Sequence, residues 1–187
     1  MKTNDECRAV INGRFLTRKI TGVDRYAREI VNELDRIAEQ GEFKLVVPAH
    51  AELVDPPALN NISIDSIGKH TGQIWEQFDL YGYCRKKRKV SVNLCNTAPL
   101  RNPGVVVIHD MAIRRHKENY SLLFRIWYRV LYAVLIKRAR AIVTVSNFSK
   151  KEIEGFYPAA RGKLVVVPNA WQHMERMKTD RNTLSRY

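Results

Sequence analysis

A histidine and an aspartate stand at the end of a strongly apolar run. Residues 105–108 are four β-forming residues, and His109 and Asp110 follow them directly. An imidazole at the end of a strand could exchange hydrogen bonds with a substrate hydroxyl or stabilise a developing charge. The alternative is a partly buried histidine that is hydrogen-bonded to the backbone, which is the more common situation for an isolated histidine. Which of these two roles His109 has depends on which other segments of the chain lie beside it.

A second segment that could do chemistry is the basic connection over residues 13–22, GRFLTRKITG, which leads into a predicted helix. The free backbone N–H groups and the dipole at a helix N-terminus favour binding of a phosphate. The segment matches neither the GxGxxG nor the Walker pattern, which argues against dinucleotide-dependent oxidoreductases and P-loop NTPases. The alternative is an ordinary loop in which Gly22 makes room for the turn.

The elements that must position these residues alternate along the chain between apolar runs and helical patterns. The runs are continuous, as is typical of strands that are buried on both faces. Predicted strands cover 8–12, 43–48, 62–67, 90–96, 105–110, 141–146 and 163–169, and predicted helices cover 23–41, 72–87, about 119–139 and about 150–157. This order predicts an α/β fold, an open, doubly wound, Rossmann-like parallel sheet of about seven strands.

Two of the predicted helices carry specific expectations. In the helix over 72–87, Ile74, Phe78 and Tyr81 fall on one face, which predicts that this face packs on the sheet. In the last helix an S-x-x-E capping box begins at Ser149, and Ser146 is the alternative cap.

The composition is that of a soluble, folded domain with a large basic excess. There are 32 Lys and Arg against 19 Asp and Glu, which gives a formal net charge of +13. Such a charge favours nucleic acid, phosphorylated small molecules or an acidic membrane surface as partners. An RNP-like aromatic motif and a basic heptad region are both absent from the sequence, so we expect no nucleic-acid partner.

The cysteines and the N-terminus bear on the compartment. The three cysteines include no CxxC pair, and the first residues contain no apolar signal region. We therefore expect a reducing, cytoplasmic location. The aromatic, basic helix over 119–139 is interpreted as part of the core, with Arg125 and Arg129 reaching outward. An anionic membrane patch is the alternative, and it would place the protein at the inner membrane face.

Five segments in order resemble the N-terminal half of a GT-B glycosyltransferase of family 4. They are INGRFLTRKITGVDRYAREIVNEL, GQIWEQFDL, VVVIHDMA, AIVTVSNFSKKEI and VVVPNA, and they span residues 10–170. The resemblance implies a two-domain enzyme with a cleft between two Rossmann-like domains. The N-terminal domain holds the acceptor, and the C-terminal domain holds the nucleotide-sugar donor.

The resemblance also implies roles for single residues. Thr21 and Gly22 map to the loop near the donor diphosphate, and His109 maps to the histidine that approaches the transferred sugar. Asp110 and the segment Trp75, Glu76 and Gln77 map to the acceptor side. Such enzymes usually retain the anomeric configuration and need no bound metal, so we expect no cofactor beyond the nucleotide-sugar co-substrate.

The sequence departs from the family pattern in three ways, and these bear on which domain of the enzyme it represents. The usual double glycine is Thr21-Gly22 here, and the usual Pro-Asn-Gly is 168–170, Pro-Asn-Ala. The family's two donor-site glutamates, separated by seven residues, occur nowhere in this sequence. We therefore expect residues 1–170 to be the N-terminal domain and 171–187 to be a tail or the start of a linker to an absent donor-binding domain.

The expected function is therefore acceptor binding within a glycosyltransferase that serves polysaccharide biosynthesis. The chain alone is expected to be inactive until a donor-binding domain or chain joins it. The acceptor would be a saccharide or a lipid-linked molecule. The alternative is a non-catalytic module that binds a saccharide, a phosphate or a protein partner.

Overall fold

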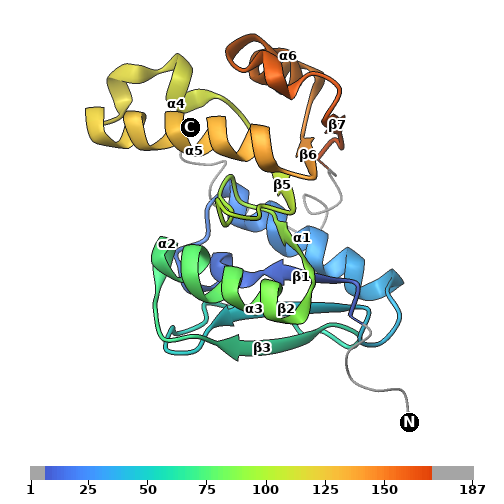
Figure 1. Cartoon of the computed structure of the whole chain (residues 1–187). Coiled ribbons are helices and arrows are strands. Elements are labelled where there is room, and N and C mark those ends of the chain that lie inside the picture. The colour runs from blue at the N-terminus through green and yellow to red at the C-terminus, as the bar shows by residue number, and fades with distance from the viewer. Residues whose placement is uncertain (1–6, 170–187) are drawn as a thin grey trace, which may run out of the picture.

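Seven apolar runs of the sequence pair side by side as parallel strands of one open sheet (Figure 1). The computed structural model describes residues 7–169. The strand order is β3-β2-β1-β4-β5-β6-β7. The strands are β1 (Ala9–Asn12), β2 (Phe43–Pro48), β3 (Ser63–Ile67), β4 (Val90–Asn93), β5 (Val105–Val107), β6 (Ala141–Thr144) and β7 (Leu164–Val166). The predicted Rossmann-like α/β fold is confirmed.

Helices connect four of the six pairs of successive strands, whereas loops without a helix join β2 to β3 and β4 to β5. The helices are α1 (Gly22–Ile37), α2 (Gly72–Trp75), α3 (Tyr81–Lys87), α4 (Ala112–Arg115), α5 (Leu122–Arg138) and α6 (Asn147–Phe156). Shorter turns are η1 (Gly13–Thr17), η2 (Glu76–Leu80), η3 (Lys117–Asn119) and η4 (Pro158–Ala160). The predicted strands and helices all exist, and most differ from the prediction by a few residues at their ends. Residues 170–187, which include the predicted tail or linker, lie outside the described part.

Alternate residues of each strand face opposite sides of the sheet, and each side is covered by different helices. Ile11 of β1 packs in one cluster with Ala27 and Val31 of α1. Its neighbour Val10 packs in another cluster with Trp75, at the end of α2. This alternation is the physical reason that helices cover both sides of the sheet, because β1 carries apolar residues on both of its faces.

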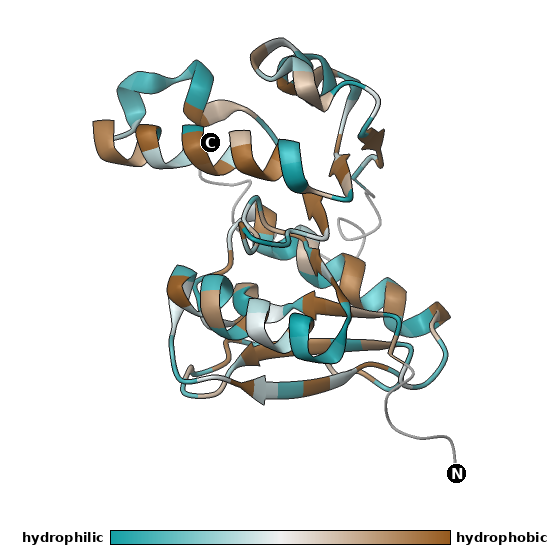
Figure 2. Cartoon of the chain, viewed as in Figure 1, coloured by the Kyte–Doolittle hydropathy of each residue, from teal (hydrophilic) through white to brown (hydrophobic). Residues whose placement is uncertain are grey.

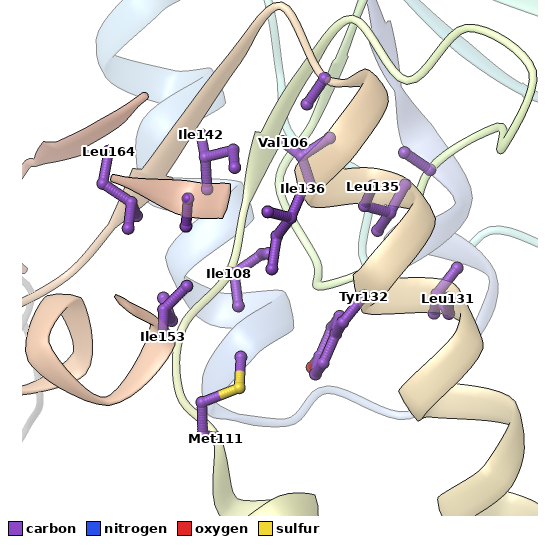
Figure 3. Close-up of a cluster of buried hydrophobic side chains, with 13 residues drawn as sticks. Val106, Ile108, Met111, Leu131, Tyr132, Leu135, Ile136, Ile142, Ile153 and Leu164 are labelled. Carbon is purple, nitrogen blue, oxygen red and sulfur yellow. The ribbon is translucent and has the colours of Figure 1, made fainter. Parts of the chain in front are cut away.

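The cluster with the most buried residues lies between β5, β6, β7 and the helices α5 and α6 (Figure 3). Tyr132, Leu135 and Ile136 of α5 point toward Val106 and Ile108 of β5 and its continuation. The core interpretation of the 119–139 helix is therefore confirmed for its C-terminal half. Its N-terminal half behaves differently, because several large apolar residues there are exposed.

The helical segment over 72–87 packs on the sheet with a different face from the one predicted. Ile74 and Phe78 are exposed, and the buried residues include Trp75, Glu76 and Leu80. The segment also contains a π-helical turn at η2 between α2 and α3. The prediction was wrong because it ranked residues by hydrophobicity, whereas a buried carboxylate occupies one of the inward positions.

The N-terminus of α6 begins earlier than the capping box predicted. The helix starts at Asn147, and the Ser146 hydroxyl accepts a hydrogen bond of 3.0 Å from the backbone N–H of Ser149. Ser146, the alternative cap, is therefore the N-cap, and the prediction of Ser149 was wrong. The side chain of Ser149 is buried instead.

No helix among residues 7–169 combines the length and the apolar character needed to cross a lipid bilayer.

Candidate functional site

The strand order reverses between β1 and β4. From β1 the sheet grows outward to β2 and β3 on one side, and to β4 through β7 on the other. In open parallel sheets ligands bind beyond the carboxyl ends of the strands at such a switch point. The residues that follow β1, β4 and β5 therefore lie at the edge of the sheet where a ligand would bind.

His109 follows β5 at this edge of the sheet and is buried, with 7% of its surface exposed. Its Nε2 lies 2.9 Å from the backbone oxygen of Leu94, and its backbone N–H donates to the side chain of Asn96 over 2.8 Å. Because a carbonyl can only accept, Nε2 carries the proton and Nδ1 keeps its lone pair. Within residues 7–169 no hydrogen bond to Nδ1 is found.

Burial makes His109 a neutral imidazole. Desolvation lowers its pKa below the ordinary value of 6.5, although the bond to Leu94 and the charges of Asp110 and Asp24 act in the opposite direction. The net direction is downward, so the ring is uncharged at pH 7. A neutral ring with a free Nδ1 lone pair can accept a hydrogen bond from a hydroxyl group.

The structure brings His109 against the start of α1. The rings of His109 and Tyr26 meet edge to face, with 4.7 Å between their centroids. Tyr26 lies in the second turn of α1, whose N-cap is Thr21. The end of β5 and the first loop therefore lie on the same edge of the sheet, as parallel strands require.

The first loop is ordered by a buried aspartate. The Thr21 hydroxyl donates to Asp24 over 2.6 Å, and its backbone N–H donates to the same carboxylate over 3.0 Å. Arg18 forms an ion pair with Asp24 at 2.6 Å, which balances the buried negative charge. Gly22 follows Thr21, and a Cβ built on it would meet nothing within 4 Å. The protein itself therefore does not require a glycine at position 22 for packing.

Glu76 is the centre of a buried polar network that joins three segments. Its Oε1 accepts hydrogen bonds from Asn12 Nδ2 over 2.7 Å and from Thr97 Oγ1 over 2.9 Å. The Nε of Arg14 lies 3.0 Å from the same oxygen, as an ion pair without hydrogen-bond alignment. Only 1% of Glu76 is exposed, and its Oε2 has no hydrogen-bond partner among residues 7–169. One carboxylate therefore holds together the end of β1, the turn η1 and the loop after β4.

The residues on either side of Glu76 also bond inward. The indole Nε1 of Trp75 donates to the backbone oxygen of Ile67 over 3.0 Å. Gln77 donates to the backbone oxygen of Ala98 and accepts from the backbone N–H of Leu100. The three residues thus fasten α2 and η2 to the sheet and to the 98–100 loop. Their predicted contact with an acceptor stays a prediction.

Asp110 is exposed, as are Thr21 and Gly22, whereas the other predicted site residues are buried or half-buried. Its Oδ1 accepts a hydrogen bond of 2.9 Å from the backbone N–H of Ala112, the first residue of α4. The carboxylate therefore orders the start of α4 and remains open to solvent at the same time. Its predicted acceptor-side role also stays a prediction.

Comparison with known proteins identifies the family. The family description "Glycosyltransferase Family 4" matches residues 20–171. The chain belongs to glycosyltransferase family 4. No curated protein and no solved structure gave a match.

In this family 4 domain, four residues of the polar network were not singled out in the sequence: Asn12, Arg14, Asn93 and Thr97. Asn12 Nδ2 donates to Asn93 Oδ1 over 3.0 Å, so the last residues of β1 and β4 are joined across the switch point. A signal for the two asparagines was present in the sequence, because β1 and β4 are both apolar runs that end in an asparagine. Arg14 and Thr97 carried no such signal, since only the fold brings them together.

Residues 7–169 of the family 4 domain contain no group of three or more His, Cys, Asp or Glu side chains arranged to hold a metal ion. That sugar transfer needs no bound metal stays a prediction.

Proposed function

We propose that this family 4 domain binds the acceptor in a glycosyltransferase that moves a sugar from a nucleotide-sugar donor to a saccharide or a lipid-linked acceptor. Transfer would need a donor-binding domain or chain, and the reaction would take place in the cytoplasm as part of polysaccharide biosynthesis. One observation carries the proposal: His109, with a free Nδ1, contacts the start of α1 at the ligand-binding edge of a family 4 domain.

The chemistry of the edge supports this role. A neutral His109 can accept a hydrogen bond from a hydroxyl of the transferred sugar without adding a positive charge beside the reacting centre. The first turn of α1 presents backbone N–H groups and the positive end of the helix dipole, which suit the donor diphosphate at Thr21 and Gly22. Arg18 balances the charge of Asp24, so this carboxylate would not repel a phosphate at full strength.

The direct test is a transfer assay with the purified 187-residue chain. We expect it to bind an acceptor saccharide or lipid-linked acceptor but to transfer no sugar from labelled nucleotide sugars. Adding a family 4 donor-binding domain, co-expressed with the chain, is expected to start transfer. Robust transfer by the chain alone would contradict the need for a second domain. Acceptor binding without transfer in the assembled protein would favour the alternative of a non-catalytic binding module.

A substitution at Gly22 tests the placement of the donor diphosphate. Because a Cβ at position 22 meets nothing in the protein, Gly22→Ala is expected to leave the free energy of unfolding unchanged or to raise it by up to about 1 kcal/mol. If the diphosphate lies against this backbone, the added methyl group blocks it and raises the KM for the nucleotide sugar in the assembled enzyme by about tenfold or more. An unchanged KM together with unchanged stability would refute the placement. Gly155→Ala in α6 is a matched control, since a Cβ there also meets nothing.

A further inference from the structure

The loops that lead into β4, β5, β6 and β7 carry a concentrated positive charge. Residues 85–89, 100–104, 137–140 and 161–163 immediately precede these four strands, and they contain five, one, three and two Lys or Arg, respectively. None of the four segments contains an Asp or a Glu. We name the four segments together the basic edge.

The basic edge is one continuous surface. Neighbouring parallel strands begin at the same edge of a sheet, so the four loops lie side by side. The backbone N–H of Arg140 donates to the backbone oxygen of Gly104 over 2.8 Å, and Lys163 Nζ donates to the backbone oxygen of Lys137 over 3.0 Å. Arg101 lies over an aromatic ring of α3. The C-terminal ends of α3 and α5, which belong to this surface, are hydrophilic (Figure 2). It lies at the opposite edge of the sheet from the candidate functional site.

Much of this charge has no acidic side chain to balance it. The exposed basic residues that form no ion pair with an acidic side chain of residues 7–169 are Arg85, Lys86, Arg88, Arg140 and Arg161. The β1–β3 half of the same edge differs. There Arg8 pairs with Glu42 at 2.9 Å. Lys44 pairs with Asp65 at 3.1 Å. At this edge, uncompensated positive charge is therefore concentrated on the β4–β7 half.

Part of the charge serves the fold. Helices α3 and α5 end within the basic edge, and cations stabilise the negative end of a helix dipole. Arg138 also donates to the backbone oxygen of Leu100 over 3.3 Å. These roles do not account for Arg140 and Arg161, which lie beyond the ends of both helices. A ligand outside the described chain would account for them.

We propose that the basic edge binds an extended acidic segment of a partner protein, whose carboxylates pair with the guanidinium and ammonium groups. Six of the eleven basic residues are arginines, and a guanidinium group can bind a carboxylate through two parallel hydrogen bonds. Four neighbouring strands at a spacing of about 4.8 Å span about 15 Å. An extended segment of about five residues covers that distance.

The composition of the basic edge disfavours other partners. Its four segments contain no Phe, Tyr or Trp, so they offer no ring on which the bases of a single-stranded nucleic acid could stack. Their apolar residues are Leu100, Pro103 and Ala139, which are half-buried or buried. A globular partner normally needs an exposed apolar anchor at the centre of its interface. Charge must therefore supply the affinity here, and a flexible acidic segment matches that requirement.

The test is fluorescence anisotropy of the full 187-residue chain with a labelled peptide of about twelve residues in which glutamate alternates with glycine. We expect binding at low ionic strength that weakens as salt is added, because salt screens exposed charges. A triple variant, Arg85→Gln, Arg140→Gln and Arg161→Gln, neutralises one side chain in each of three loops. It is expected to lower the affinity for the peptide by about tenfold.

A second triple variant, Lys69→Gln, Lys117→Gln and Lys151→Gln, is the matched control. These three lysines are also exposed and lie outside the basic edge, so the net charge of the chain falls by the same amount. The control is expected to lower the affinity by at most about twofold. If the wild-type chain does not bind the peptide, or if the two triple variants weaken binding equally, the proposal is wrong. Tighter binding of a single-stranded RNA oligonucleotide of the same charge, weakened by the first triple variant alone, would identify a nucleic acid as the occupant and also overturn it.

Discussion

Replacing Glu76 with alanine is expected to lower the free energy of unfolding by about 3–5 kcal/mol. The substitution leaves Arg14, whose side chain is only 11% exposed, as a buried charge without its counter-ion. It also removes the acceptor for Asn12 and Thr97, and each buried donor without a partner costs a further desolvation penalty. Urea unfolding of the wild-type chain and the variant at pH 7 measures the difference.

Two further variants separate charge from hydrogen bonding. Glu76→Gln keeps an oxygen for Asn12 and Thr97 but removes the charge, so its loss of stability should be smaller than that of Glu76→Ala. Arg14→Ala combined with Glu76→Ala should cost less than the sum of the two single changes, because the double variant leaves no unpaired charge. A loss below about 1 kcal/mol in Glu76→Ala would show that the network does not stabilise the fold.

The strands of this domain could be predicted from the sequence because each is a short, continuous apolar run between loop residues. The same reasoning failed for the helical segment over 72–87. There the inward positions include Glu76, whose partners lie 64 residues away at Asn12 and 21 residues away at Thr97. Hydrophobic periodicity cannot detect a buried carboxylate, since its burial is compensated only by residues that the fold brings to it.

The candidate ligand-binding edge of the sheet was predictable in outline and not in detail. The position of His109 at a strand end, and of Thr21 and Gly22 before a helix, is visible in the sequence. The tautomer of His109 is not, because it depends on the carbonyl of Leu94, which reaches the ring only through the pairing of β4 with β5. Likewise, the contact between His109 and Tyr26 arises from the packing of α1 on the sheet.

His109→Gln is expected to lower kcat for sugar transfer about 100-fold in the assembled enzyme, at a cost of about 1–2 kcal/mol in the free energy of unfolding. The glutamine amide can reach the position of Nε2 and keep the bond to Leu94, which preserves the structural role. It offers no acceptor at the position of Nδ1, which removes the proposed contact with the sugar. Steady-state kinetics and urea unfolding of the same preparation measure the two effects.

His109→Asn is expected to have the opposite effects, because it keeps an acceptor near Nδ1 and loses the bond to Leu94. Its amide oxygen can stand near the position of Nδ1, while its shorter side chain cannot reach Leu94. If Nδ1 contacts the sugar, the asparagine variant is the less stable of the two and yet the more active. If His109 only supports the fold, activity follows stability and the glutamine variant is the more active. The rank order of the two variants therefore decides between the two roles of this histidine.

The pH dependence gives an independent readout of the same ring. Burial lowers the pKa of His109 in the folded state below the 6.5 of an exposed histidine, so between these two values the unfolded chain binds more protons than the folded one. This contribution to stability is complete above pH 6.5 and is lost as the pH falls through the pKa of the folded state. His109→Gln lacks a titrating ring, so its unfolding free energy should fall less than that of the wild-type chain over the same interval. Parallel curves for the two proteins below pH 6.5 would mean that the ring is not held neutral, and the neutral acceptor proposed for the sugar hydroxyl would lose its basis.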